Sequence, residues 1–348
     1  MTLLLTPALL LLPQGNEIKT DYPAERTLKI VAETVTELET TNFSFERDGE
    51  PLGDRFGGGG GGSSTERVVE YTDTVLESED GRATKVSRAF DDVEMTGSMG
   101  EGERARDFDR ESPLVGETLI LSADGEDVAA ELDGGEPENP DVLKGHHLGL
   151  PLDGLLPEGE VEAGDTWEPE KDALLQALLM DIEGSLFPRP SFEDGGERGG
   201  REGGGRGGRS GRGGGSSTGF MMMAEWDIEA ELLEATEDID GIECVVIELE
   251  CSADGDLPER NFGRGGRDRF LSPVATESLR TQDNTYEVEL EGKLYFSLEE
   301  KRPVKMELEG EFTLETGFER EREGSVMSME RTQEGEIEYT ITIEEAGE

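Results

Sequence analysis

Alternating apolar and charged residues over 285–316 constrain the fold more than any other feature of this chain. Even-numbered positions carry apolar residues or glycine, most odd-numbered positions carry charge, and a turn at 299–302 divides the run. Alternation with period two over this length predicts two antiparallel strands with one buried and one solvated face. Each strand has about thirteen residues, well beyond the usual five or six, which indicates a strongly curved sheet.

The register of this hairpin can be inferred from its turn and its glycines. Pairing Leu298 with Val304 places Gly292 opposite Gly310 on the apolar face, where missing side chains permit a bend or a close approach of another element. The same register sets glutamates opposite one another on the charged face, at a small cost per pair. A shift by two residues keeps both faces but loses the glycine pair.

β-rich segments occur on both sides of a different central region. The predicted strands are 27–46, 68–76, 83–95, 117–121, 127–132, 224–233, 242–251, and a last pair that starts at 326–329 and ends over 337–343. Several are separated by Asp-Gly, a strong hairpin signal. We expect an N-terminal β half over 16–132 and a C-terminal β half over 220–348 that form one continuous sheet.

Residues 133–183 are predicted to form a proline-rich connector and a helix, because repeated prolines prevent a continuous strand before 168. Pro169 suits the first turn of a helix over 169–183, and Gly184 suits its end. One apolar stripe runs along it: Leu174, Leu175, Leu178, Leu179 and Ile182. We therefore predict a mainly β fold, in which a long, strongly curved antiparallel sheet resembling a half-barrel packs one amphipathic helix on its apolar face.

The net charge disfavours some classes of binding partner, and the glycine content predicts disordered segments. The formal net charge of −51 repels nucleic acid and anionic lipid headgroups, and favours a soluble monomer. Glycine-rich stretches at 57–62, 184–219 and 262–269 cannot bury enough surface to order themselves, so 184–219 is predicted to be a disordered loop. Its arginines lack the aromatic neighbours typical of RNA-binding arginine-glycine segments.

The first residues predict export. Residues 1–12 are almost entirely apolar, too few to span a bilayer, and match the central region of a secretory signal within a segment over 1–15. We expect the mature chain to lie in the periplasm, cell envelope or extracellular space, with no transmembrane segment. The alternative is a buried N-terminal segment.

No sequence motif indicates catalysis, a cofactor or a strong metal site. His146 and His147 are the only histidines; neighbours in an extended segment point apart, and no third ligand has metal spacing nearby. The acidic segments 238–241 and 254–256 fit turns better than weak calcium sites. Cys244 and Cys251 are predicted on opposite faces of one strand, beyond disulfide reach. We expect a protein that is not an enzyme.

Two segments carry a resemblance. The run Leu-Pro…Val-x-x-Gly-Asp-Thr-Trp at 156–167, Ser-Pro-Leu-Val-Gly at 112–116 and the terminal hairpins resemble an uncharacterised group of exported bacterial proteins of planctomycete type. More remotely, the layout resembles the half-barrels of lipoprotein carriers and mycobacterial lipid-binding lipoproteins, which implies an apolar, lipid-like ligand between sheet and helix. The glycine insertions and the lack of a lipobox depart from those patterns, and no functional residue transfers by position.

Two hypotheses about function follow. In the first, an exported non-enzymatic protein holds a lipid-like ligand in a connected apolar cavity. The expected ligand face comprises Val288, Leu290, Leu294, Phe296, Met306, Leu308, Phe312, Leu174, Leu178 and Trp167. In the second, the helix fills the sheet, and the chain is a structural or interaction protein of the envelope. Trp167 either stacks on the ligand or anchors the helix to the sheet.

Overall fold

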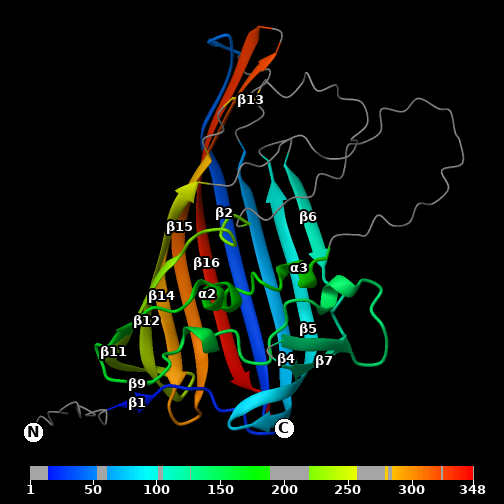
Figure 1. The fold of residues 1–348 in the computed structure, drawn as a ribbon, viewed down its shortest axis with the longest axis vertical. Helices are drawn as coiled ribbons and strands as arrows, with labels where there is room; N and C mark the ends of the chain where they lie inside the picture. The colour runs from blue at the N-terminus through cyan, green and yellow to red at the C-terminus, as the bar shows by residue number, and fades with distance from the viewer. Residues whose placement is uncertain are drawn as a thin grey trace, which may run out of the picture.

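The computed structural model describes residues 15–52, 61–100, 105–125, 127–188, 219–256, 279–280, 284–322 and 324–347. The predicted signal segment up to residue 14 lies outside them, as do 189–218 and 257–278, which contain most of the arginine-glycine stretches. The described residues form a mainly β structure dominated by one open antiparallel sheet of 14 strands (Figure 1).

Neighbouring strands of the sheet follow one continuous path. Its order is β10 (Thr166–Trp167), β11 (Asp227–Ile239), β12 (Ile242–Asp256), β14 (Asn284–Ser297), β15 (Arg302–Arg322), β16 (Ser325–Glu345), β2 (Thr27–Arg47), β4 (Ser63–Glu79), β5 (Arg82–Met99), β7 (Thr118–Asp124) and β8 (Asp127–Leu132). Three short strands lie off this path: β3 (Glu50–Pro51) on β2, β6 (Arg106–Glu111) on β5 and β13 (Leu279–Arg280) on β15. Because β16 pairs with β2, both halves of the chain contribute to the same sheet.

Two predicted hairpins have turns that require left-handed backbone. Asp80 and Gly81 join β4 to β5, and Asp240 and Gly241 join β11 to β12, all with positive φ. Such pairs suit the two-residue turns whose twist matches that of the flanking strands, which confirms the Asp-Gly signal at both places.

The predicted register of the β14–β15 hairpin is wrong by two residues. Gly292 lies opposite Leu308, and Gly310 lies opposite Leu290. Ser297 pairs with Arg302, so the loop takes four residues, and a bulge follows where Phe296 faces Pro303. Proline has no backbone N–H to donate to the ladder and is accommodated at a bulge, which displaces the pairing from the predicted one.

The same bulge moves Val304 off the predicted apolar face. Val304 packs with Cys244, Val246 and Tyr295 in a small buried cluster separate from the main core. Cys251 belongs to the main core instead. The two free cysteines therefore lie on opposite faces of β12, as predicted.

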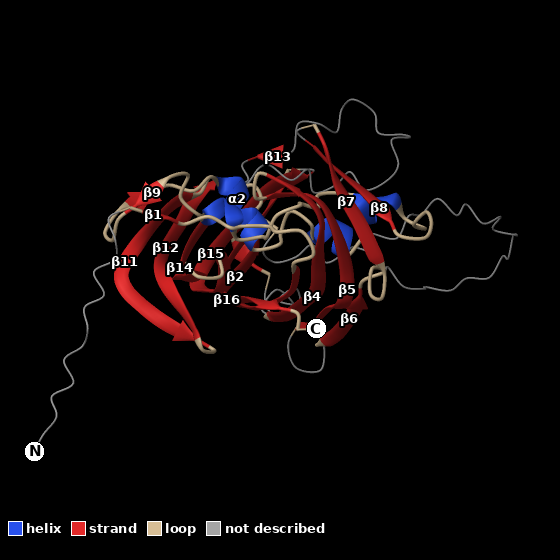
Figure 2. Cartoon of the chain, turned by 90° about the horizontal axis from the view of Figure 1, so that it is seen from below, coloured by secondary structure: helices blue, strands red, loops and turns tan. Residues whose placement is uncertain are grey.

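The main core lies between one face of the sheet and the segment over 133–188. This segment contains η2 (Pro140–Leu143), η3 (Asp153–Leu155), α2 (Lys171–Ala177) and α3 (Glu183–Leu186), and a strand pair of β9 (Glu160–Val161) with β1 (Asn16–Glu17) lies beside it. Figures 1 and 2 show the helices on one face of the sheet. The stripe predicted from the sequence is buried there in full.

The single helix predicted over 169–183 is divided in two, and Gly184 lies inside α3 rather than ending a helix. The break occurs at Leu179, which has a positive φ of 51°. Side chains from the sheet bind the carbonyls just before it: Tyr339 Oη donates to Ala177 O at 2.6 Å, and Arg67 Nη2 donates to Leu178 O at 2.8 Å. These donors, which come from strands distant in sequence, satisfy the last carbonyls of α2. The apolar pattern in the sequence continues past this point and therefore predicted a longer helix.

Candidate functional site

The structure brings the residues of the predicted ligand face together, and other side chains of the protein pack against them. Its nine sheet and helix members are each at most 3% exposed and belong to one continuous core: Val288, Leu290, Leu294, Phe296, Met306, Leu308, Phe312, Leu174 and Leu178. Trp167 is partly buried at the edge of this core, where its Nε1 donates to Leu155 O at 2.9 Å. That hydrogen bond anchors β10 to η3.

Side chains fill the space over this face. The strand predicted from 224 in fact starts at Asp227, and Phe220 precedes it. The Phe220 ring lies 5.6 Å from the ring of Tyr286 and 5.5 Å from that of Phe312, measured between centroids. Together with α2, it supplies the apolar contacts that the first hypothesis assigns to a ligand.

Two pockets in the described part of the chain can be compared with the predicted cavity. One, of about 510 Å³, lies at the end of the sheet near Arg26; the other, of about 10 Å³, lies under the connector near Tyr71. Neither is lined by a residue of the predicted ligand face.

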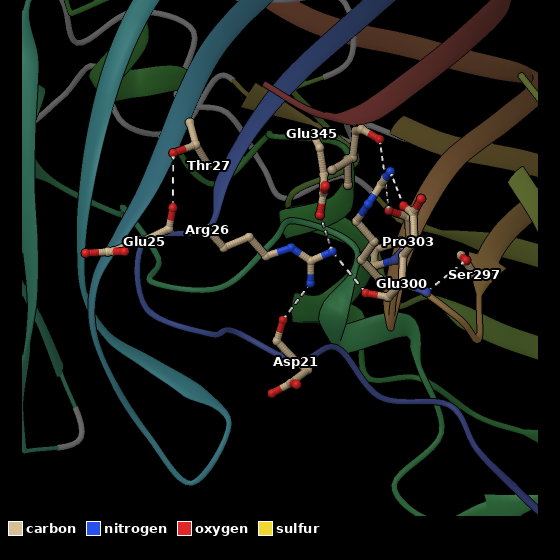
Figure 3. Close-up of polar contacts among 10 residues, drawn as sticks. Asp21, Glu25, Arg26, Thr27, Ser297, Glu300, Pro303 and Glu345 are labelled. Atoms are coloured by element: carbon tan, nitrogen blue, oxygen red, sulfur yellow. Dashed lines mark hydrogen bonds and ion pairs between the residues drawn. The ribbon is translucent and has the colours of Figure 1, made fainter. Parts of the chain in front are cut away.

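Most of the residues that line the larger pocket are charged, and one of them is the partly buried Arg26. Figure 3 shows the polar contacts of this arginine. Arg26 Nη1 donates to Asp21 O at 2.8 Å, and its Nη2 lies 2.9 Å from Glu300 O and 3.0 Å from Glu345 Oε1. The guanidinium therefore joins the N-terminal segment, the β14–β15 turn and the end of β16. Five carboxylate residues line the pocket against two cationic ones: Asp21, Glu25, Glu299, Glu300 and Glu345 against Arg26 and Lys301.

A second arginine supports the same corner. Arg302 is 2% exposed, donates to Ile343 O and forms an ion pair with Glu300 at 2.5 Å. The sequence pattern placed Arg302 at the end of a turn over 299–302. Its burial depends on the partner strand β16, which the hairpin pattern does not contain. Both arginines hold chain segments together at this pocket.

A buried polar cluster lies between the connector and strands β4 and β5. Arg88 Nε and Nη2 donate to the two carboxylate oxygens of Asp73 at 2.8 and 2.7 Å, and Nη2 also donates to His147 O at 3.2 Å. The guanidinium carbon lies 4.4 Å from the ring centroid of Tyr71. A two-pronged ion pair of this kind has strong directional preference, so it fixes the Arg88 guanidinium on the sheet. From there, the hydrogen bond to His147 O joins the connector to the sheet.

The two histidines point to different partners, as predicted. His146 is buried, its ring lies 6.0 Å from that of Phe90, and its Nε2 is 2.9 Å from Val142 O. Burial lowers the pKa of His146 to about 4, so Nε2 donates to this carbonyl from a neutral ring at pH 7. His147 instead pairs with Asp181.

A third polar group joins the N-terminal segment to η3, and sequence reasoning missed it. Asp153 accepts hydrogen bonds from Thr20 Oγ1 at 2.6 Å, from Tyr22 Oη and from Leu150 N at 3.1 Å. Burial raises the pKa of Asp153 to about 6, although these three donors lower it. Thr20 and Tyr22 lie more than 130 positions away along the chain, beyond any local sequence signal.

The segments weighed for metal binding are accounted for by local structure. Asp238 Oδ1 accepts a hydrogen bond from Gly241 N at 2.9 Å, so 238–241 forms the predicted turn. The turn predicted at 254–256 is wrong, because these residues continue β12. Over the described ranges, no group of three or more His, Cys, Asp or Glu side chains is arranged to hold a metal ion.

The opposite face of the sheet carries rows of exposed glutamates. One row crosses five consecutive strands and consists of Glu229, Glu250, Glu291, Glu309 and Glu338. The next crosses four strands and consists of Glu289, Glu311, Glu336 and Glu37. We call these two rows the glutamate face. Like charges opposite one another oppose pairing, so packing of the other face must hold these strands together.

Comparisons with known proteins identify no family. No protein-family model matches the sequence, and no curated protein matches it. Among solved structures, the chain is similar to the outer membrane protein OprG from Pseudomonas aeruginosa at 6% identity, with 93% of this chain and 98% of that chain covered and a TM-score of 0.18. A likeness at this score carries no inference. Within the described residues, no helix has the length and apolar character needed to cross a membrane.

Proposed function

We propose that this protein is a non-enzymatic structural or interaction protein of the cell envelope, with a filled core and no bound lipid. The observation that carries the proposal is the packing of the predicted ligand face against α2 and Phe220. A carrier needs its apolar face free for the ligand, whereas here protein side chains already occupy it.

Export to the envelope is part of the proposal. It rests on the apolar run at 1–12 and on the resemblance of 156–167 to exported bacterial proteins. The polar clusters support a non-enzymatic role, because Arg26, Arg88 and Asp153 each connect segments that are distant in sequence. A monomer is expected, since the charge of −51 makes copies of the chain repel one another.

We also propose that the sheet is bent as a half-barrel around its core. Backbone contacts at two strand glycines support this: a Cβ atom on Gly292 would lie 1.9 Å from Glu307 O, and one on Gly310 would lie 2.0 Å from Glu289 O. Strand glycines commonly occur where neighbouring backbones approach closely at a bend.

The working surface we propose is the glutamate face. Because its carboxylates are exposed and the core face is covered, the partner that fits it is a cationic one, such as a basic protein segment. Attraction to such a partner should weaken as salt is added.

Native mass spectrometry of protein purified from its own host tests the filled core. We expect the mass of the bare mature chain, since side chains of the protein occupy the predicted ligand face. A co-purifying lipid mass that survives gentle desolvation and disappears after unfolding would instead support the carrier hypothesis.

Truncation of a core leucine provides a second test. Leu174→Ala should lower the free energy of unfolding by about 2–5 kcal/mol, because it opens a cavity in a packed core. The matched control is Leu76→Ala, at an exposed leucine of β4, which should cost within about 0.5 kcal/mol. If both substitutions cost equally little, Leu174 does not pack as described.

A further inference from the structure

We propose that one water molecule binds in the small cavity between the connector and strands β4 and β5, and bridges the hydroxyl of Tyr71 to the connector. This joint cavity has a volume of about 10 Å³. Its lining comes from both sides of the interface: Tyr71 and Arg88 from the sheet, and His147, Gly149, Pro151, Gln176, Leu179, Asp181 and Ile182 from the connector.

The hydroxyl of Tyr71 requires a partner. The side chain is 0% exposed, and no described protein group hydrogen-bonds its Oη. A buried hydroxyl without a hydrogen bond costs stability, and such groups are rare in native proteins. Tyr339, also on the core face, shows the usual solution, since its Oη donates to Ala177 O.

The size of the joint cavity and the unpartnered hydroxyl of Tyr71, which lines it, select water. A volume of about 10–15 Å³ holds one water molecule, provided two to four polar partners surround it. Arg88, His147, Gln176 and Asp181 are the other residues with polar side chains among those that line the joint cavity. The nearby carboxylates of Asp73 and Asp181 disfavour an anion, and the volume excludes an organic ligand.

Backbone features explain why the gap persists. Gly149 and Pro151 present little side chain to it, and the left-handed turn at Leu179 directs the chain away from a continuing helix. The Arg88–Asp73 ion pair holds the sheet side fixed. Water therefore completes an interface that neither side can close with its own groups.

The test compares two buried tyrosines by replacement with phenylalanine. Tyr71→Phe removes the unpartnered hydroxyl of a residue that lines the joint cavity, and Tyr339→Phe removes one bonded directly to protein. We expect Tyr71→Phe to lower the melting temperature and to remove one long-lived water per molecule in magnetic relaxation dispersion of solvent water. Tyr339→Phe should also lower the melting temperature but retain that water.

A dry cavity would give the opposite result. If Tyr71→Phe melts at the same or a higher temperature and the count of long-lived waters does not change, no water binds there and the proposal is wrong. A crystal structure of the unaltered chain provides a readout independent of folding. It should show a solvent peak within about 3.2 Å of Tyr71 Oη, and a high-resolution map without that peak would overturn the assignment.

Discussion

At the scale of single residues, this protein places ionisable groups in its interior and uses them to connect segments. Asp153 joins the N-terminal segment to η3, Arg26 joins three chain segments, and Arg88 joins the connector to the sheet. Each charge or carboxyl is tolerated in the interior because several hydrogen bonds converge on it. The resulting stability depends on pH in a direction that can be worked out.

Asp153 should destabilise the folded state as pH rises. Its folded pKa of about 6 lies above the ordinary aspartate value of 3.8, so the folded state retains the proton longer. Its favourable contribution is complete below about pH 4 and is lost as pH rises through about 6. Asp153→Asn lacks this titration, so its stability relative to the unaltered chain should improve by on the order of 2–3 kcal/mol between pH 4 and pH 7.

Urea denaturation of both proteins at these two pH values measures the effect. Taking the difference between the proteins cancels the titration of the many surface carboxylates they share. A difference that stays constant with pH would show that Asp153 titrates as an ordinary carboxyl.

At the scale of elements, the long strands depend on glycine where neighbouring backbones approach. Gly292 of β14 faces Leu308 of β15, with Glu307 O where a side chain would begin. The two glycines do not face each other, so each makes room in its own pairing. Gly292 and Gly310 therefore have separate steric roles.

Gly292→Ala should therefore lower the free energy of unfolding by about 1–3 kcal/mol, because the neighbouring backbone must move to admit the methyl group. Gly184→Ala in α3 is the control, since nothing lies within 4 Å of the place where its Cβ would stand. That substitution should be neutral or stabilising, as alanine favours a helix. Chemical denaturation compares them; equal effects would contradict the steric role of Gly292.

At the scale of the whole molecule, an acidic surface covers a well-packed interior. The glutamate face opposes strand pairing, and the apolar face compensates through burial of Leu290, Phe312 and their neighbours. Each buried side chain contributes roughly 1.5–3 kcal/mol, whereas each like-charged pair costs less than about 1 kcal/mol. Packing therefore prevails, and salt should relieve the remaining repulsion.

We expect the melting temperature to rise with sodium chloride concentration, since screening reduces repulsion among exposed charges. Neutralising three adjacent glutamates of the longer row with Glu291→Gln, Glu309→Gln and Glu338→Gln should raise the melting temperature at low salt and flatten its salt dependence. Glutamine at the exposed connector residues Glu136, Glu138 and Glu158 removes the same charge elsewhere. If the two triple variants show the same change in melting temperature and in its salt dependence, the stability depends only on the net charge of the chain.

The same two variants test the interaction surface. Binding of a short oligolysine peptide, measured by calorimetry at low salt, should weaken much more in the variant of the glutamate face than in the connector variant. Equal weakening would show that the peptide responds to total charge, and the glutamate face would then lose its proposed role.

Local patterns in the sequence determined the strands, two of the Asp-Gly turns and the burial of the stripe from Leu174 to Ile182, because period and turn chemistry act over a few residues. Tertiary structure alone decided the rest. Val304 found its place in a second cluster with Cys244 and Val246 of β12, and donors from β4 and β16 ended α2 before Leu179. The partners of Arg26, Arg88 and Asp153 are distant in sequence, and only folding brings them within hydrogen-bonding distance.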